Sequence, residues 1–456
     1  MEPLKIAELV LATDGECLNM TGNINIDGIC TDSRKIKPGE LFIPIIGENF
    51  DGHEFIEYAI RAGSVAVLSD RYLKNEKIPY IKVKNTTKAL LDIAGYYRTK
   101  FEIPAIAITG SSGKTTAKDM IAAVLGQSFN VLKNEGNFNN AIGLPGTIFN
   151  LNKNHEICVL EMGMNSFGEI RQLAKAVKPD IAVITNIGTA HIEFLKTQQG
   201  ILKAKLEIIE FFNKNNTLII NGDDELLKSE RFEKFNVMRF GMDETNDIYA
   251  YAIKQTENKG TEFSVKIGDL VEKFFIPMMG IHNVYNGLSA ITVGICLGMS
   301  LERIKSGLLG FKPPDMRMES IILDNGMTII NDAYNANPES MKAAIKTLHN
   351  MICKNRKLLI LGDMMELGEY TEKGHYEVGK YAATNGIDAL IAIGERSKKI
   401  TEGAIENGLK EVYHFENNEK AKDELIDILK PSDTVLVKGS RSVKLEEIVY
   451  FLRERR

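Results

Sequence analysis

The chain is poor in cysteine, has no long hydrophobic run and carries little net charge. Its five cysteines are scattered and include no Cys-x-x-Cys pair, which argues against a disulfide framework and against a zinc site. The most apolar stretch, residues 287–299, is too short and too interrupted by glycine to span a bilayer. The N-terminus has no basic segment followed by an apolar run. These absences favour a protein of the reducing cytoplasm, without membrane insertion.

The near balance of charge bears on the partners of the chain. A formal net charge of -5 over 456 residues gives no general attraction to nucleic acid or to anionic lipid. Small molecules are therefore the expected partners, with no nucleic acid among them. The sequence also lacks internal repeats, low-complexity tracts and long linkers. A monomer is the default expectation for the oligomeric state.

The length and the rhythm of the sequence predict an α/β protein of about three domains. Residues 1–103 combine short strand-like runs, turn clusters and one helical pattern, which indicates a small α/β domain. Residues 104–313 alternate buried strands with helical segments, which predicts a central domain with a mostly parallel sheet flanked by helices. The same rhythm restarts after Pro313-Pro314, so residues 314–456 are expected to form a Rossmann-like α/β domain.

Short apolar runs mark the expected strands of the two larger domains. The expected buried strands cover residues 105–109, 157–160, 181–185, 218–220, 328–330, 357–361, 389–393 and 434–437. Residues 247–277 instead alternate apolar and polar side chains, which predicts added strands with one face in water.

The first of these strands leads into a candidate phosphate-binding loop. Glycine exposes backbone N–H groups at the start of a helix, a lysine neutralises phosphate charge, and a hydroxyl can bind magnesium. Ile108 stands where the common phosphate loop has its first glycine, so the loop is shorter than the usual pattern. An ordinary glycine-rich strand end is the alternative interpretation. The candidate ATP-binding loop comprises Gly110, Ser111, Ser112, Gly113, Lys114, Thr115 and Thr116.

Two further strand ends carry candidate metal ligands. Glu161 ends a buried strand, and a carboxylate at the same sheet edge as the phosphate loop suits a magnesium ion. A solvated acid at a strand end is the alternative. His191 lies in the loop after a third strand. Thr115, Glu161 and His191 are expected to form one polar rim, although a histidine there could shuttle protons instead of binding metal.

The helix expected over residues 198–209 contains a lysine in its apolar stripe. Lys205 has isoleucine or leucine at each position three and four residues away, whereas the corresponding neighbours of Lys203 are Gln199, Gly200, Leu206 and Glu207. Burial favours the neutral amine, which can react with carbon dioxide to give a carbamate, a negatively charged group that magnesium accepts. The alternative is a lysine whose stem is buried and whose ammonium reaches water. The pattern alone leaves these two interpretations equally open.

The phosphate loop, Glu161-Met162-Gly163, the His191 loop and Lys205 together resemble the Mur ligases of peptidoglycan synthesis. The resemblance implies that Lys205 is carbamylated and holds a second magnesium ion with His191, while Thr115 and Glu161 hold the first. It further implies catalytic roles for Lys114, Lys205, His191 and Arg317, and ATP contacts from Asn283, Arg317 and Asp332.

Other segments resemble the branch of this family that adds D-alanyl-D-alanine. They are Asn137-Phe138-Asn139-Asn140-x-x-Gly143, Asn335-Ala336-Asn337-Pro338-x-Ser340 and residues 361–368. The resemblance implies UDP-N-acetylmuramoyl-tripeptide and D-alanyl-D-alanine as substrates. Its substrate-binding residues are Ser33, Arg34, Asp51, Gly52, His53, Asn139, Asn140, Tyr334, Asn335, Asn337, Lys438 and Arg441. Lys438 and Arg441 follow a buried strand and precede a helix, where they could meet the dipeptide carboxylate.

The mechanism implied is attack of the tripeptide carboxylate on the γ-phosphate of ATP, followed by attack of the dipeptide amine on the acyl phosphate. We expect an open form without ligands and a closed form with them. Two alternatives remain: a ligase of this family that adds a single amino acid, and a nucleotide-binding regulator that joins no substrates. No residue identifies itself as the base that deprotonates the attacking amine.

Overall fold

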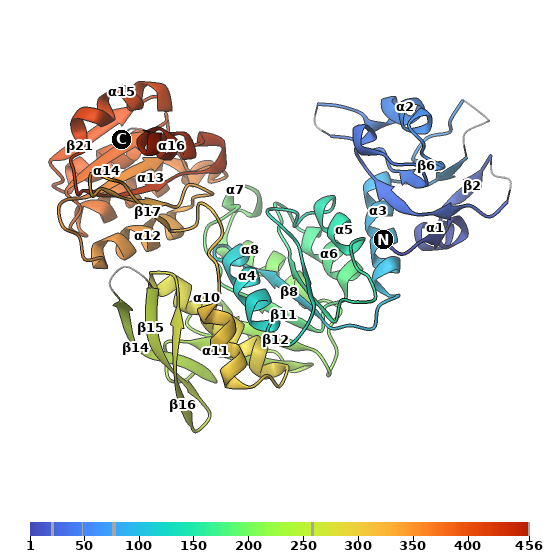
Figure 1. The fold of residues 1–456 in the computed structure, drawn as a ribbon, viewed down its shortest axis with the longest axis horizontal. Helices are drawn as coiled ribbons and strands as arrows, with labels where there is room; N and C mark the ends of the chain where they lie inside the picture. The colour runs from blue at the N-terminus through green and yellow to red at the C-terminus, as the bar shows by residue number, and fades with distance from the viewer. Residues whose placement is uncertain (20–21, 48, 75–78, 257–259, 455–456) are drawn as a thin grey trace. The chain divides into compact units, whose positions relative to one another are not determined.

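The computed structural model describes residues 1–19, 22–47, 49–74, 79–256 and 260–454 (Figure 1). Its internal contacts divide the chain into two compact units. The first unit comprises residues 1–109, 129–182 and 206–217, and the second comprises residues 110–128, 183–205 and 218–456. The division passes through the central sheet. The fold is α/β, as predicted, and each predicted domain contains a sheet of its own.

The N-terminal sheet lies in the first unit and has the strand order β2-β7-β6-β5-β4. Its strands are β2 (Glu16–Leu18), β4 (Gly28–Cys30), β5 (Glu40–Phe42), β6 (Ala66–Ser69) and β7 (Tyr80–Lys82). A separate pair joins β1 (Leu4–Lys5) to β3 (Asn25–Ile26). The helices of this region are α1 (Ile6–Thr13), α2 (Ile56–Arg61) and α3 (Thr86–Arg98). Phe42, Val67 and Tyr80 pack against Ile56 and Ala59 in a core between the sheet and α2.

The central sheet has nine strands in the order β16-β15-β14-β13-β12-β11-β8-β10-β9. In the first unit, β8 (Ala105–Thr109) and β9 (Val131–Lys133) pair in parallel with β10 (Ile157–Glu161). The next strands in sequence are β11 (Ile181–Ile184), β12 (Thr217–Asn221) and β13 (Asn236–Gly241). The helices of the first unit that belong to this region are α5 (Gly143–Ile148) and α6 (Glu169–Val177).

The second unit extends the central sheet with three long strands, as the alternating pattern predicted. β14 (Ile248–Thr256), β15 (Gly260–Ile267) and β16 (Leu270–Ile276) form an antiparallel ribbon, which Figure 1 shows beside α10 and α11. The short helices of this unit are α7 (Ile192–Leu195), α8 (Gln198–Leu206) and α9 (Glu225–Ser229). The helix expected over residues 198–209 is therefore α-helical only to Leu206, and a 3-10 turn covers Glu207–Ile209.

The helix that follows the phosphate loop packs closely on two others in the second unit. α4 (Lys114–Leu125) contacts both α10 (Ile281–Cys296) and α11 (Leu301–Leu309). A Cβ atom at Gly307 of α11 would lie 2.5 Å from Cα of Val124, which is closer than real Cβ contacts. Glycine at this position therefore permits the close approach of the two helix backbones.

The C-terminal sheet also lies in the second unit, in the order β17-β18-β22-β19-β20-β21. β17 (Glu319–Ile322) is antiparallel to β18 (Thr328–Asn331), and the pairs among the remaining strands are parallel. Those strands are β19 (Lys357–Gly362), β20 (Ala389–Ile393), β21 (Glu411–Phe415) and β22 (Thr434–Lys438). The helices are α12 (Pro338–Asn350), α13 (Thr371–Ala383), α14 (Lys398–Glu406), α15 (Asn418–Ile428) and α16 (Glu446–Glu454).

The predicted buried strands of the two larger domains all appear, and each end agrees with the prediction to within one residue. The strands β9, β13, β17 and β21 were not predicted. Within the described part of the chain, no helix is long and apolar enough to cross a bilayer.

Candidate functional site

The predicted phosphate loop connects the end of β8 to the start of α4 and depends on its two glycines. Gly110 and Gly113 have φ values of 155° and 77°, which disfavour any residue with a Cβ. A Cβ at Gly110 would lie 1.9 Å from Oγ1 of Thr185, and one at Gly113 would lie 2.6 Å from Oδ1 of Asn286. The loop therefore needs glycine for its backbone conformation and for the close approach of its neighbours.

Two residues that follow β11 support this loop from the side. The backbone N–H of Ser111 donates to the carbonyl of Asn186 at 3.0 Å, and that of Ser112 donates to the Asn186 side chain at 2.9 Å. Thr185 Oγ1 donates to the carbonyl of Ser112 at 2.6 Å. Sequence reasoning missed this supporting role, although Thr185-Asn186 follows a predicted buried strand. These hydrogen bonds fix the conformation of the loop from its side.

Two lysines share one carbonyl oxygen of the loop. Nζ of Lys114 and Nζ of Lys205 each donate to the carbonyl oxygen of Gly110 at 2.9 Å. Lys205 is only 1% exposed, whereas Lys203 on the same helix is exposed. The prediction that Lys205 is buried while Lys203 is not is therefore confirmed. Thr115, the predicted magnesium ligand, is the second residue of α4 and is half-buried.

Glu161 belongs to the first unit and ends β10 opposite Ile108 of β8, beside the residue that precedes the phosphate loop. Its backbone N–H donates to the Asn134 side chain at 2.8 Å, and its Oε1 accepts from Asn139 Nδ2 at 2.7 Å. The other oxygen, Oε2, is buried and has no hydrogen-bond partner in the described part of the chain. Because an unpaired buried carboxylate oxygen is costly, this atom fits a cation ligand. Asn139, predicted to bind substrate, holds the Glu161 carboxylate here.

His191 precedes α7 and has a left-handed backbone, with a φ of 65°. Its Nδ1 lies 2.7 Å from Oε2 of Glu366, a residue of the C-terminal region that sequence reasoning did not select. The hydrogen bond to His191 lowers the pKa of Glu366, against the opposing effect of burial. The only sequence signal for Glu366 is its place in the motif Leu361-Gly362-Asp363-Met364-Met365-Glu366. That motif marks a family branch and does not distinguish Glu366 from its neighbours.

The ends of β18 and β22 carry a buried ion pair. Nζ of Lys438 lies 2.6 Å from Oδ2 of Asp332 and also donates to the carbonyl of Asn335 at 2.9 Å. The side chains of Lys438 and Asp332 are 2% and 10% exposed. Burial lowers the pKa of Lys438, and the charge of Asp332 opposes this shift. Asp332, predicted to contact ATP, and Lys438, predicted to contact the dipeptide, therefore contact each other in this structure.

The other predicted ATP residues of the second unit lie near this pair or near the loop. Asn283 donates to the carbonyl of Met279 at 2.8 Å and accepts from Asn286 at 3.1 Å. The Arg317 guanidinium lies 4.3 Å from the centre of the Tyr334 ring, a cation–π contact. Burial lowers the pKa of His282, next to Asn283, to about 4.

The predicted substrate residues Asn337 and Arg441 occupy different environments. Asn337 caps the start of α12, and its Nδ2 donates to the carbonyl of Ser111 at 3.4 Å. Arg441 is 56% exposed and pairs with Glu446 at 2.8 Å. Because Lys438 is buried against Asp332, Arg441 is the more accessible cation after β22. Asn140 accepts from the backbone N–H of Gly143 at 2.9 Å, which is a structural role at the start of α5.

The predicted N-terminal substrate residues form two turns in the first unit. Arg34 is 83% exposed and pairs with Asp32 at 2.9 Å, and this pair lowers the pKa of Asp32 to about 2. Asp51 caps the turn before α2 by accepting from the backbone N–H of His53. His53 lies between Asp51 and Asp70, at 2.7 and 3.1 Å.

Two other predicted N-terminal residues, Ser33 and Gly52, are buried. A Cβ at Gly52 would lie 2.6 Å from the backbone nitrogen of Ile45, so glycine is needed there.

Comparisons with known proteins match this chain to one family. Three family models match successive segments: "Mur ligase family, catalytic domain" over residues 25–98, "Mur ligase middle domain" over 108–294, and "Mur ligase, glutamate ligase domain" over 316–441. A curated UDP-N-acetylmuramoyl-tripeptide–D-alanyl-D-alanine ligase of Bacillus subtilis is 43% identical over 94% of this chain and 93% of its own length. This chain belongs to the Mur ligase family.

Solved structures agree with this assignment. The Mur ligase described here is similar to MurF from Acinetobacter baumannii, with a TM-score of 0.92 and 31% identity over 100% of both chains. It is also similar to MurF of Thermotoga maritima in complex with ADP, with a TM-score of 0.85, 28% identity, and coverage of 93% and 97% of the two chains. The three-domain architecture of the family, predicted from the sequence, is confirmed.

Among the described residues of this Mur ligase, no group of three or more His, Cys, Asp and Glu side chains is placed to hold a metal ion.

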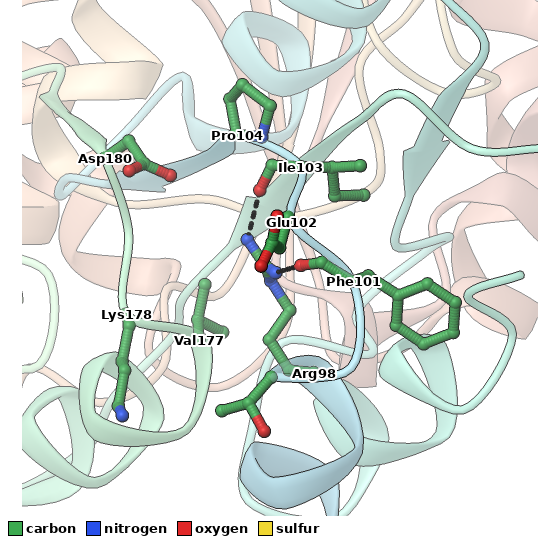
Figure 2. A pocket seen from close by; sticks show the side chains of 9 residues that line it. Arg98, Phe101, Glu102, Ile103, Pro104, Val177, Lys178 and Asp180 are labelled. Atoms are coloured by element: carbon green, nitrogen blue, oxygen red, sulfur yellow. Dashed lines mark hydrogen bonds between the residues drawn. The ribbon is translucent and has the colours of Figure 1, made fainter. Parts of the chain in front are cut away.

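A pocket of about 420 Å³ in the first unit contains none of the predicted site residues (Figure 2). It lies beside the segment that joins α3 to β8, at the amino end of β8 and thus away from the phosphate loop. Figure 2 shows the Arg98 guanidinium bonded to the carbonyls of Phe101 and Ile103. Arg98 therefore fixes the path of this connecting segment.

Proposed function

We propose that this Mur ligase joins D-alanyl-D-alanine to UDP-N-acetylmuramoyl-tripeptide in peptidoglycan precursor synthesis, at the expense of ATP. The reaction gives the corresponding pentapeptide, ADP and phosphate. The observation that carries the proposal is the 43% identity, over 94% of the chain, to a Bacillus subtilis protein named for this reaction. The conformation of the phosphate loop supports ATP as the energy source.

Each part of the loop has a role in handling phosphate. The backbone N–H groups at the start of α4 and the Lys114 ammonium would hold the phosphate oxygens. Arg317 would add positive charge near the γ-phosphate while the carboxylate of the tripeptide attacks it. Because both reactants are anions, charge neutralisation and positioning supply most of the catalysis. Asn283 and Asp332 would contact the nucleoside part of ATP.

The residues present fit magnesium. Glu161 Oε2 is buried without a partner among the described residues, and the hydroxyl of Thr115 and the imidazole of His191 are further donors. Thr115 and Glu161 would hold one ion, and His191 with a modified Lys205 would hold a second. When bound, magnesium would withdraw charge from the phosphate oxygens.

The shared acceptor supports carbamylation of Lys205. Two ammonium groups on the carbonyl oxygen of Gly110 repel each other, and burial adds a further cost to the charge of Lys205. A neutral Lys205 amine can attack carbon dioxide, forming a C–N bond and releasing one proton. The product is an anion whose remaining N–H can still donate to Gly110.

Different groups of residues would contact the nucleotide part and the peptide parts of the substrates. Ser33, Arg34, Asp51, Gly52 and His53 would contact the uridine diphosphate part of the tripeptide substrate. Near the ends of β10 and of the C-terminal strands, the candidates for contact with the peptide substrates are Asn139, Asn140, Tyr334, Asn335, Asn337, Lys438 and Arg441. Of the two cations after β22, the exposed Arg441 is the better candidate for the dipeptide carboxylate.

Mass spectrometry of the product tests this function directly. The enzyme is incubated with ATP, magnesium and UDP-N-acetylmuramoyl-tripeptide, and with D-alanyl-D-alanine, lysine, diaminopimelate or glutamate in parallel. We expect a product only with the dipeptide, together with equimolar phosphate. A product with a single amino acid would favour another ligase of the family. Phosphate release independent of any amine would favour a nucleotide-binding regulator.

A further inference from the structure

We propose that Glu366 is a positioning residue for His191, so that a loop of the C-terminal region orients a metal ligand beside the phosphate loop. The proposal rests on the metal-binding role of His191 in the proposed function. It goes beyond that function because it assigns a role to a residue that the proposed function leaves without one.

The first observation is the contact itself. Oε2 of Glu366 lies 2.7 Å from Nδ1 of His191. The Nδ1 atom is buried, and among the described residues the ion-pair contact with Glu366 reaches it, although the alignment of the two groups is not that of a good hydrogen bond. A carboxylate at Nδ1 keeps the ring proton on that nitrogen, so Nε2 is left with a lone pair for a metal ion.

The second observation is that both residues have an unfavourable backbone. His191 has a φ of 65° and Glu366 a φ of 60°, values that residues other than glycine rarely adopt. Such conformations persist only where the surrounding structure imposes them, and they concentrate at functional sites. Because His191 and Glu366 both have such a conformation and contact each other, the surrounding structure must hold the two residues in this arrangement.

The third observation is that the neighbouring backbone holds the two loops together. The backbone N–H of Glu193 points to the carbonyl of Glu366 at 3.4 Å, and Gly368 packs against Glu193. Leu367, between Glu366 and Gly368, is only 1% exposed. The Glu366 loop is thus anchored and holds its carboxylate in place.

A second carboxylate of the C-terminal region contacts the same loop without touching the imidazole. Oε2 of Glu339, in the first turn of α12, accepts from Oγ1 of Thr189 at 2.9 Å. Glu339 therefore shares with Glu366 any role in docking the loop, but it cannot influence the ring nitrogens of His191 directly. Variants of Glu366 and of Glu339 can therefore distinguish positioning of the His191 ring from contact between its loop and the C-terminal region.

The physical consequence is a linkage between metal binding and the C-terminal loop. A carboxylate bonded to the far nitrogen orients the ring and makes the ligating nitrogen more basic, and loss of such a partner costs about 10- to 100-fold in metal affinity. By thermodynamic reciprocity, a metal ion on His191 must strengthen the docking of the Glu366 loop by the same factor.

The test measures metal binding by the full chain without turnover. Mn²⁺ is titrated into the enzyme with a non-hydrolysable ATP analogue and bicarbonate, and imidazole coordination is read from nitrogen couplings in electron paramagnetic resonance. We expect Glu366→Ala to weaken the imidazole-bound Mn²⁺ by at least about 10-fold, and Glu366→Gln to weaken it less. Glu339→Gln is expected to stay within about 2-fold of wild type, and so is Glu369→Gln, an exposed control in the same loop.

Each alternative outcome has a definite meaning. Equal Mn²⁺ affinities for wild type and Glu366→Ala would overturn the proposal, and so would equal losses in Glu366→Ala and Glu339→Gln. Absence of imidazole coupling in the wild type would also overturn it. The product analysis is an independent measurement, so none of these results decides whether the enzyme joins the dipeptide. Thermal unfolding followed by circular dichroism confirms that the variants fold.

Discussion

The buried pair of Asp332 and Lys438 allows a quantitative prediction about stability. Their charged atoms lie 2.6 Å apart, and the side chains are 10% and 2% exposed. Replacing Lys438 with Met would leave the Asp332 carboxylate buried, with a remaining donor in the backbone N–H of Met318 at 3.2 Å. Because an unpaired buried charge costs about 3–5 kcal/mol, we expect Lys438→Met to lower the unfolding free energy by about 3 kcal/mol.

The double variant distinguishes pairing from independent effects. In Asp332→Asn with Lys438→Met both charges are gone, so the loss should be smaller than the sum of the single losses by about 2 kcal/mol or more. The chain contains no tryptophan, so urea unfolding is best followed by far-UV circular dichroism. Single losses below about 1 kcal/mol that simply add would refute the reasoning.

The same variants bear on dipeptide binding. If Lys438 serves mainly as the partner of Asp332, its loss reduces stability, whereas loss of the exposed Arg441 should raise the KM for the dipeptide at unchanged stability. An unchanged KM in Arg441→Ala would remove Arg441 from the dipeptide site. A raised KM in Lys438→Met at wild-type stability would instead return Lys438 to it.

Three further changes have outcomes that follow from the structure. Lys205→Ala should lower kcat at least about 100-fold, because metal-assisted charge neutralisation contributes several kcal/mol. Added small carboxylates should restore part of the lost activity. Full activity of Lys205→Ala without added carboxylate would contradict the carbamate. Burial lowers the pKa of His282 to about 4, so the unfolded chain binds the proton more tightly. The unfolding free energy should therefore fall by up to about 3 kcal/mol as the pH drops from 6.5 to 4, and His282→Gln should flatten this dependence in urea titrations. Gly307→Ala places a Cβ 2.5 Å from Val124 Cα and should lower the unfolding free energy by about 1–3 kcal/mol. Gly146→Ala, where a Cβ would have no atom within 4 Å, should be neutral or stabilising. Equal effects of the two variants in thermal unfolding would contradict the packing argument.

Local signals in the sequence predicted the elements that carry the chemistry. The apolar run before Gly110 predicted β8, and the spacing of apolar residues around Lys205 predicted its burial, because both depend on neighbours close in the chain. β17 and β21 were missed because they are short edge strands whose side chains are mostly half-exposed, so they lack a continuous apolar run.

Contacts between distant segments were beyond sequence reasoning. His191 and Glu366 lie 175 positions apart by their residue numbers, and nothing in either local pattern indicates the other. Asp332 and Lys438 are also far apart in the sequence, so their pairing could not be predicted from local patterns. The resemblance assigned Asp332 to ATP and Lys438 to the dipeptide, whereas the structure pairs them with each other. The family resemblance supplied candidate residues, whereas the structure showed which of them already have partners.

The carbonyl oxygen of Gly110 accepts hydrogen bonds from Lys114 and Lys205 at the same time. A polyphosphate offers Lys114 a stronger partner, so its arrival would leave the oxygen to Lys205 alone. Occupancy of the loop by nucleotide would therefore influence the carbamylation proposed for Lys205, because it changes the partner of the neighbouring Lys114.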